Sequence, residues 1–277
     1  HLSIFGIKQD RSLDSKIFSS RYRTFALGLL TGLLNGLIAL GGGVLITPFL
    51  ILAGFSPQVA VGTSLVAVTM LSCIGFTAHL LLGGASIDFA LIFAVSVGGV
   101  IGTFIGAKIL ARITPQWMLI LFAIIQIFVA IRLLDQGLGL TLMGEEVVPS
   151  IPPLKAYIGL SVFAGILSGI FGVGGGALVL LGLAAFYGLP VIEGLALALA
   201  LNVTNALAGV ARHVRNGKIL WRELMFIIPA ALLGVLLGAT LAHELPSDLM
   251  SVLFGGFFTF MGIVLARKGH RLTKKCS

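Results

Sequence analysis

Two runs of three consecutive glycines are the residues whose type and spacing most directly suggest chemistry. They comprise Gly41, Gly42 and Gly43 in the first half of the chain and Gly174, Gly175 and Gly176 in the second. Each run interrupts an apolar stretch, so we expect it to break a helix and to free backbone groups that lipid cannot satisfy. A short helix that begins there would present unpaired N–H groups, which suit an anion. Close helix packing is the alternative interpretation.

Uncharged polar side chains inside the apolar stretches form a second group of candidates. They are Asn35, Ser168, Thr69, Ser72, Asn202 and Asn205, with Thr63, Ser64 and Thr204 nearby. Thr69 and Ser72 are three residues apart, as are Asn202 and Asn205, so each pair shares a helix face. These groups could donate hydrogen bonds to an anion. Ordinary bonds between helices are the alternative, which we favour for the serines and threonines.

Two histidines and one arginine near the ends of apolar stretches could serve in proton transfer or gating. His79 and His213 occupy matching places before Gly83 and Gly217, and Arg212 adjoins His213. Packing or an interfacial position is the alternative for the histidines. For Arg212 we favour an anchor at the lipid headgroups over a role in attracting an anion.

The composition indicates that the chain, and with it these candidate residues, lies in a membrane. The chain has 277 residues, of which 58% are hydrophobic and only 10% are charged, with a mean hydropathy of +1.12. A soluble domain usually has about 25% charged residues, so the sequence predicts an all-α polytopic membrane protein. No charged residue lies near the middle of an apolar stretch, which argues against a buried carboxylate relay.

Ten apolar stretches follow one another along the chain, and two of them are too short to span a membrane comfortably. A span needs about 20 residues, whereas 44–54 and 176–188 are shorter and lie beside the glycine runs; whether they span or re-enter stays open. We therefore expect 8–10 membrane segments. The stretches are 24–40, 44–54, 59–82, 88–111, 116–134, 156–172, 176–188, 193–211, 223–242 and 249–266.

The two halves of the chain repeat each other. Residues 32–43 read GLLNGLIALGGG and residues 165–176 read GILSGIFGVGGG. Gly102 and Gly106 match Gly234 and Gly238 in the same register. An odd number of segments in each half predicts inverted repeats, each with about three full transmembrane helices and a glycine-broken hairpin. The predicted divisions are an N-terminal tail (1–23), a first repeat (24–134), a linker (135–155), a second repeat (156–266) and a C-terminal tail (267–277).

The distribution of charge predicts which loops lie inside the cell. With both termini cytoplasmic, every basic residue except Arg132 and Lys155 falls on the inner side, as the positive-inside rule requires. Most acidic residues fall on the outer side, including the linker. The net charge of +8 therefore reflects topology in an inner (plasma) membrane and not nucleic-acid binding.

On these residues the chain resembles the TauE/SafE family of sulfite exporter-like permeases, of the 4-toluene sulfonate uptake type. The resemblance rests on the two glycine-run motifs, on Pro57 or Pro190 in the following loop, and on a later helix that ends in Gly-x3-His-x3-Gly. It covers nearly all of residues 24–266. It implies an inner-membrane secondary carrier of small anions, chiefly sulfite, sulfonates such as sulfoacetate, and related organosulfur compounds.

The two repeats depart from the family pattern in different ways. The first keeps the Gly-Thr-Ser step as Gly62 to Ser64, whereas the second has Leu195 to Ala198 there. The second keeps Asn205, whereas the first has Leu71. If these positions contact the substrate, the site is asymmetric.

Our hypothesis from the sequence is a secondary transporter for a small sulfur-containing anion, working by alternating access around a midplane cavity. An anion-selective channel, or a carrier of another carboxylate or oxyanion, is the alternative. We expect no enzyme activity, because no cluster of histidines with carboxylates and no Cys/His pair occurs, and we expect no metal or cofactor. Coupling to H⁺ or Na⁺ stays open, as does the oligomeric state, for which a homodimer is one option.

Overall fold

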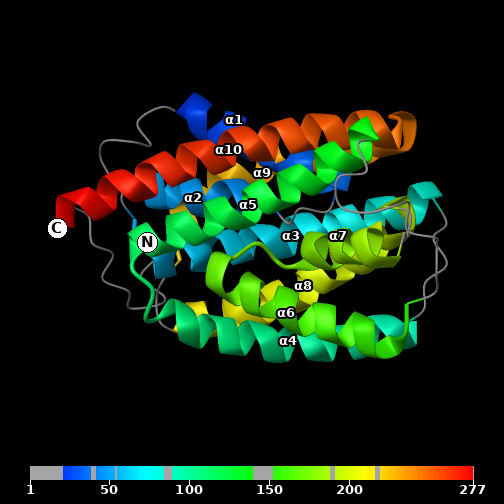
Figure 1. The fold of residues 1–277 in the computed structure, drawn as a ribbon, viewed down its shortest axis with the longest axis horizontal. Coiled ribbons are helices and arrows are strands. Elements are labelled where there is room, and N and C mark those ends of the chain that lie inside the picture. The colour runs from blue at the N-terminus through cyan, green and yellow to red at the C-terminus, as the bar shows by residue number, and fades with distance from the viewer. Residues whose placement is uncertain are drawn as a thin grey trace.

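The regular secondary structure of the described part of the chain is all α-helix. The computed structural model describes residues 21–38, 42–53, 55–83, 89–139, 152–187, 191–215 and 219–276, which form ten α-helices and no strand (Figure 1). The helices are α1 (Arg21–Ile38), α2 (Gly43–Leu52), α3 (Pro57–Gly83), α4 (Phe89–Leu110), α5 (Pro115–Leu138), α6 (Leu154–Phe171), α7 (Gly176–Tyr187), α8 (Val191–Arg215), α9 (Trp221–Glu244) and α10 (Ser247–Cys276).

Seven of the described helices are long and apolar enough to cross a membrane. They are α3, α4, α5, α6, α8, α9 and α10, and α1 adds a shorter apolar segment, Phe25–Leu37. Large apolar side chains such as Phe93 and Phe260 are 73% and 65% exposed, as expected where the surrounding medium is lipid. The chain is therefore a multi-pass membrane protein, as its composition predicts.

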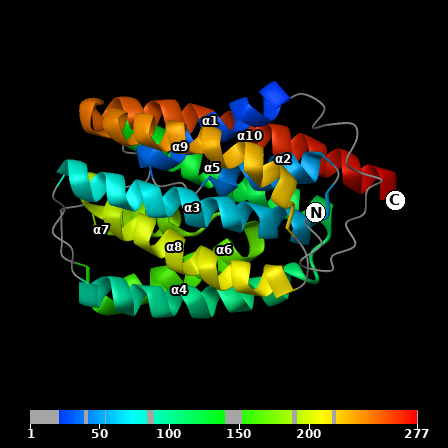
Figure 2. The same ribbon diagram turned by 180° about the vertical axis from the view of Figure 1, so that it is seen from behind.

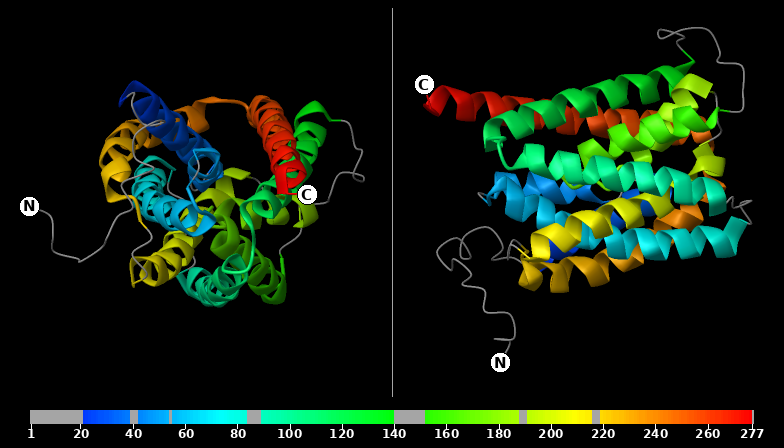
Figure 3. Two further views of the ribbon diagram at one scale, coloured as in Figure 1. Left: turned by 90° about the vertical axis from the view of Figure 1, so that its left-hand side faces the viewer. Right: turned by 90° about the horizontal axis from the view of Figure 1, so that it is seen from below.

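Helices α2 and α7 are too short to cross. They have 10 and 12 residues, so they extend only about 15 and 18 Å, roughly half of a hydrocarbon core. In the end-on view they lie toward the middle of the bundle (Figure 3, left). The two stretches that follow the glycine runs therefore form half-length helices inside the protein.

The helix packing has the same pattern when the two halves of the chain are exchanged. Helix α1 packs along α9 and, correspondingly, α6 packs along α4; α5 packs along α10 and α3 along α8. Figures 1 and 2 show that α4, α6 and α8 form one side of the bundle, and that α1, α9, α5 and α10 form the other. Each side thus combines helices from both halves.

Glycines hold two of these helix pairs at very close range. A methyl group on Gly32 or Gly36 of α1 would overlap the backbone of α9, and one on Gly234 of α9 would overlap that of α1. Gly102 and Gly106 of α4 meet the carbonyl groups of Val162 and Ile166 of α6 in the same way. Much of the repeated glycine pattern therefore serves backbone-to-backbone packing.

Several helices extend beyond the apolar stretches that predicted them. Helix α10 continues to Cys276, although its apolar stretch ends at residue 266. Lys and Arg are good helix formers and are favourable near a helix C-terminus, so charge ends the apolar pattern without ending the helix. Helices α5 and α6 similarly take up both ends of the predicted linker 135–155, of which residues 140–151 lie outside the described part.

Candidate functional site

The first glycine run begins α2. Gly42 has a left-handed φ of 68° and accepts hydrogen bonds at its carbonyl from the N–H groups of Leu45 and Ile46, at 3.2 and 3.3 Å. No side chain caps the helix. A methyl group on Gly43 would overlap the carbonyl of Gly172, so α2 begins in direct contact with the second glycine-rich turn. Gly41 lies outside the described residues.

The second turn runs from Gly172 to Gly176 between α6 and α7. Gly172, Gly174 and Gly175 have φ values of 71°, 90° and 91°, which L-residues with a side chain rarely adopt. Gly172 ends α6 with a 2.7 Å bond from its N–H to the carbonyl of Ser168. The described residues of both glycine runs thus form the helix breaks that the sequence predicts.

Three polar side chains hold the second turn. Asn202 Oδ1 accepts a 2.7 Å bond from the N–H of Gly176, and Asn205 Nδ2 donates a 2.9 Å bond to the carbonyl of Gly174. Ser64 Oγ donates a 2.9 Å bond to the carbonyl of Gly172. All three side chains are fully buried. Asn202 and Asn205 do share one face of α8, as their spacing predicts, and that face binds the protein's own backbone.

Some of the remaining polar candidates form hydrogen bonds within or between helices, and others are buried without one among the described residues. Thr69 bonds to the carbonyl of Leu65 within its own helix, at 2.9 Å. Thr63 accepts a 3.0 Å bond from the N–H of Leu220, and Thr204 bonds to Ser96. The hydroxyls of Ser72 and Ser168 are buried without a hydrogen-bond partner among the described residues, and Asn35 is fully buried on α1.

The histidines occupy buried positions between helices. His79 Nε2 lies 3.1 Å from the carbonyl oxygen of Gly36 on α1, and the side chain is 5% exposed. His213 is similarly buried on α8, and its neighbour Arg212 is partly exposed. His79 thus lies in the contact between α3 and α1, and its role in proton transfer or gating stays a prediction.

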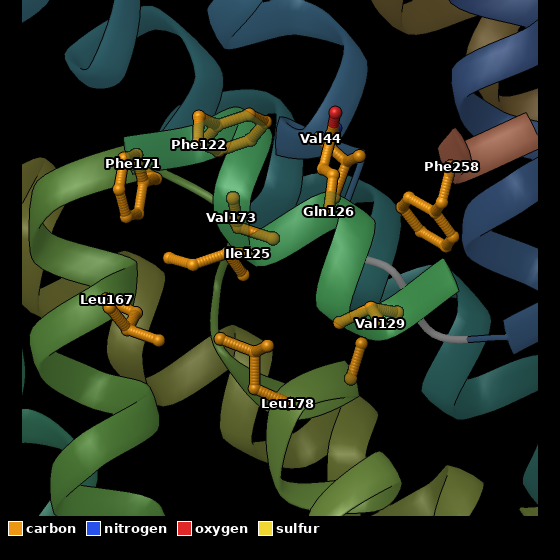
Figure 4. A pocket seen from close by; sticks show the side chains of 11 residues that line it. Val44, Phe122, Ile125, Gln126, Val129, Leu167, Phe171, Val173, Leu178 and Phe258 are labelled. Carbon is orange, nitrogen blue, oxygen red and sulfur yellow. The ribbon is translucent and has the colours of Figure 1, made fainter. Parts of the chain in front are cut away.

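A pocket lies where the two half-length helices begin, and we call it the α2–α7 pocket (Figure 4). The first turn of α2 contributes Val44, and the first turn of α7 contributes Ala177 and Leu178. Figure 4 shows Gln126 rising from α5 beside Val44. The other lining residues are apolar: Phe122, Ile125, Val129, Leu167, Phe171, Val173 and Phe258.

Comparison with known proteins decides the family. The model of the sulfite exporter TauE/SafE family matches residues 24–265. The chain belongs to this family. The match spans both glycine turns and nearly every described helix, so it confirms the resemblance drawn from the repeated motifs.

Relatives of this TauE/SafE protein carry matching names. A probable membrane transporter protein, YunE, of Bacillus subtilis is 24% identical over 88% of this chain and 96% of its own length. A probable membrane transporter protein of Xylella fastidiosa (strain Temecula1) is 29% identical over 84% and 89%. Sulfite exporter TauE/SafE family protein 2 of Arabidopsis thaliana is 30% identical over 42% of this chain and 25% of its own length. No solved structure matches the chain significantly.

Gln126 is the residue of this TauE/SafE protein that the sequence reasoning missed. It is 3% exposed, and neither its Nε2 nor its Oε1 has a hydrogen-bond partner among the described residues. The signal that could have found it is one amide side chain in the middle of the apolar stretch 116–134. Within the same described residues, no group of three or more His, Cys, Asp or Glu side chains is placed to bind a metal ion.

Proposed function

We propose that this TauE/SafE protein is a secondary transporter of a small sulfur-containing anion, such as sulfite or a sulfonate, across the inner membrane. The anion binds in the α2–α7 pocket, and alternating access opens the pocket to one side at a time. The observation that carries the proposal is that both half-length helices begin at this one pocket.

Helix N-termini can bind an anion without a formal positive charge. Each presents N–H groups that lack intrahelical partners, and the helix dipole favours negative charge there. No Lys or Arg lines the pocket, so a bound anion would be held by neutral donors. Weak neutral contacts suit a carrier, because the substrate must also be released.

The arrangement of the halves supports alternating access around an inverted repeat. Matching helices such as α3 and α8, or α5 and α10, run in opposite directions in Figures 1 and 2. The start of α1 and the end of α10 lie toward the same end of the bundle. Both features fit cytoplasmic termini and a site between two inverted halves.

Counterflow in proteoliposomes tests the proposal. Vesicles loaded with unlabelled sulfite, sulfoacetate or taurine should accumulate the labelled compound transiently and with saturation. Imposed H⁺ or Na⁺ gradients should then identify any coupling ion. Absence of saturable flux for every oxyanion would refute an anion carrier, and unitary currents in a planar bilayer would identify a channel instead.

A further inference from the structure

The last turns of α10 concentrate positive charge on one side of the helix. Five of residues 267–276 are Lys or Arg, and residues 249–277 contain no acidic residue. At 3.6 residues per turn, the five positions fall within about one third of the helix circumference. We call this side the basic face of α10, and its positions are Arg267, Lys268, Arg271, Lys274 and Lys275.

The basic face points away from the helix on which α10 packs. Gly269 faces α5, because a Cβ there would lie 2.8 Å from Cγ1 of Ile120 and 3.3 Å from the carbonyl oxygen of Gln116. Arg267 and Arg271 are each two residues from Gly269, which places them about 200° around the helix from it. Both are exposed. Figures 1 and 3 show that α10 also continues beyond the start of α5.

The same side of α10 is exposed and mostly apolar throughout the preceding turns. Its exposed positions recur every three or four residues, as positions on one helix face do. They are Leu249, Leu253, Gly256, Phe260 and Ile263, and Arg267 and Arg271 continue the series. An exposed apolar face of a spanning helix packs against lipid tails. The basic face therefore begins where these lipid tails end.

The depth of the basic face matches the layer of lipid headgroups. The apolar stretch 249–266 is about 27 Å long, close to the thickness of a hydrocarbon core. The five basic positions extend about 12 Å further, through the headgroup layer. Trp117, which is exposed in the first turn of α5, adds an aromatic ring of the kind that is enriched at this interface.

We propose that the basic face of α10 is a docking surface for the headgroups of anionic phospholipids. Arg267 and Arg271 donate to the phosphate oxygens of lipids whose acyl chains lie along Phe260 and Leu253. A zwitterionic headgroup brings an ammonium group to the same charges, so a headgroup with net negative charge binds better. The bound lipid fixes the depth of α10 and, through their close packing, that of α5. The inference goes beyond the proposed transport function and does not depend on it.

The test compares thermal unfolding of the full chain in detergent with added phosphatidylglycerol or phosphatidylcholine of the same acyl chains. Phosphatidylglycerol should raise the unfolding temperature more, and added salt should reduce the difference. In Arg267→Gln/Arg271→Gln, the apparent affinity for phosphatidylglycerol should fall about 10-fold or more. Arg267→Lys/Arg271→Lys keeps both charges and should retain most of the affinity.

Lys108→Gln/Arg112→Gln is the matched control. It also removes two exposed positive charges, from the last turn of α4 and the loop that follows, and leaves the basic face intact. Its affinity for phosphatidylglycerol should stay unchanged. An equal loss in both glutamine variants would mean that net charge attracts the lipid, which overturns a site on α10.

The remaining outcomes decide between a lipid and other ligands. Equal stabilisation by the two lipids, or unchanged affinity in Arg267→Gln/Arg271→Gln, would overturn the inference. If inorganic phosphate stabilised the original protein as well as phosphatidylglycerol does, the ligand would be a soluble anion. This comparison needs only the original protein, so it still decides if a variant does not fold. Counterflow is measured separately, so failure here leaves the proposed function standing.

Discussion

The two glycine turns differ in how the protein satisfies their backbone. The second turn has Asn202, Asn205 and Ser64 bonded to Gly176, Gly174 and Gly172. The described part of the first turn is packed by apolar atoms: a Cβ on Gly42 would lie 2.7 Å from Cγ2 of Thr31 and 3.2 Å from Cδ1 of Leu71. Leu71 stands where the second half has Asn205.

The starts of α2 and α7, which are equivalent in the repeat, therefore differ in their capping. The N–H of Gly176 is already used by Asn202, whereas α2 begins without a side-chain cap. The second turn is therefore held by side-chain hydrogen bonds, whereas no side chain caps the start of α2. Asn205 bonds to the second turn and Leu71 packs by apolar atoms near the first; an asymmetric substrate site stays a prediction.

The largest expected effect comes from separating the two turns. Gly43→Ala would place a methyl group on the carbonyl of Gly172, so we expect the free energy of unfolding to fall by about 3 kcal/mol or more. Gly256→Ala is the control, because a Cβ there meets nothing within 4 Å. Chemical denaturation in detergent measures both. Equal stabilities would mean that the turns do not touch.

Replacing Asn205 by leucine, the residue at the equivalent position 71, should lower the free energy of unfolding by less than Gly43→Ala does. Asn205→Leu leaves the buried carbonyl of Gly174 without its 2.9 Å bond, which predicts a loss of about 1–3 kcal/mol. The reverse change, Leu71→Asn, buries an amide beside Gly42 and should also destabilise. If Asn205→Leu retained full stability but lost transport, Asn205 would be a ligand residue and not a support.

A smaller effect is expected at Ser64, which links the halves. Ser64→Ala removes the 2.9 Å bond from α3 to the carbonyl of Gly172, so stability should fall by about 1 kcal/mol. Thr77→Ala is the control, because Thr77 is exposed on the same helix and its hydroxyl donates to the carbonyl of Cys73 within that helix; it should change stability much less. The same denaturation assay applies, and a loss no greater than that of the control would remove Ser64 from the support of the turn.

The smallest effect is expected at His79 in the first half. His79→Gln keeps a side chain able to donate to the carbonyl of Gly36, so stability should change by less than about 0.5 kcal/mol. Transport rates measured between about pH 5 and 8 should follow the profile of the original protein. Loss of that pH dependence would make His79 a proton carrier.

The sequence predicts those features that depend on backbone geometry. Helix breaks and close helix crossings both require glycine, so the paired patterns of Gly32 with Gly165 and of Gly102 with Gly234 are visible without coordinates. The spacing of Asn202 and Asn205 also places them correctly on one face. Their partner is the second turn, however, and spacing cannot tell a bond to the protein from one to a substrate.

Features that depend on which helices enclose a space could not be predicted. Gln126 is one amide in an apolar helix, and a hydrogen bond between helices would account for it equally well. Only the convergence of α5 with the starts of α2 and α7 places it in a pocket. Phe258 joins that pocket from α10, far away in sequence.

The glycine-packed crossings join helices from different halves of the chain. Helix α1 of the first half is locked onto α9 of the second, and α4 of the first half onto α6 of the second. Moving one repeat relative to the other would disrupt both the α1–α9 and the α4–α6 interface. In the proposed transport cycle, we therefore expect the rigid bodies to be pairs of helices from different repeats, and not the two repeats themselves.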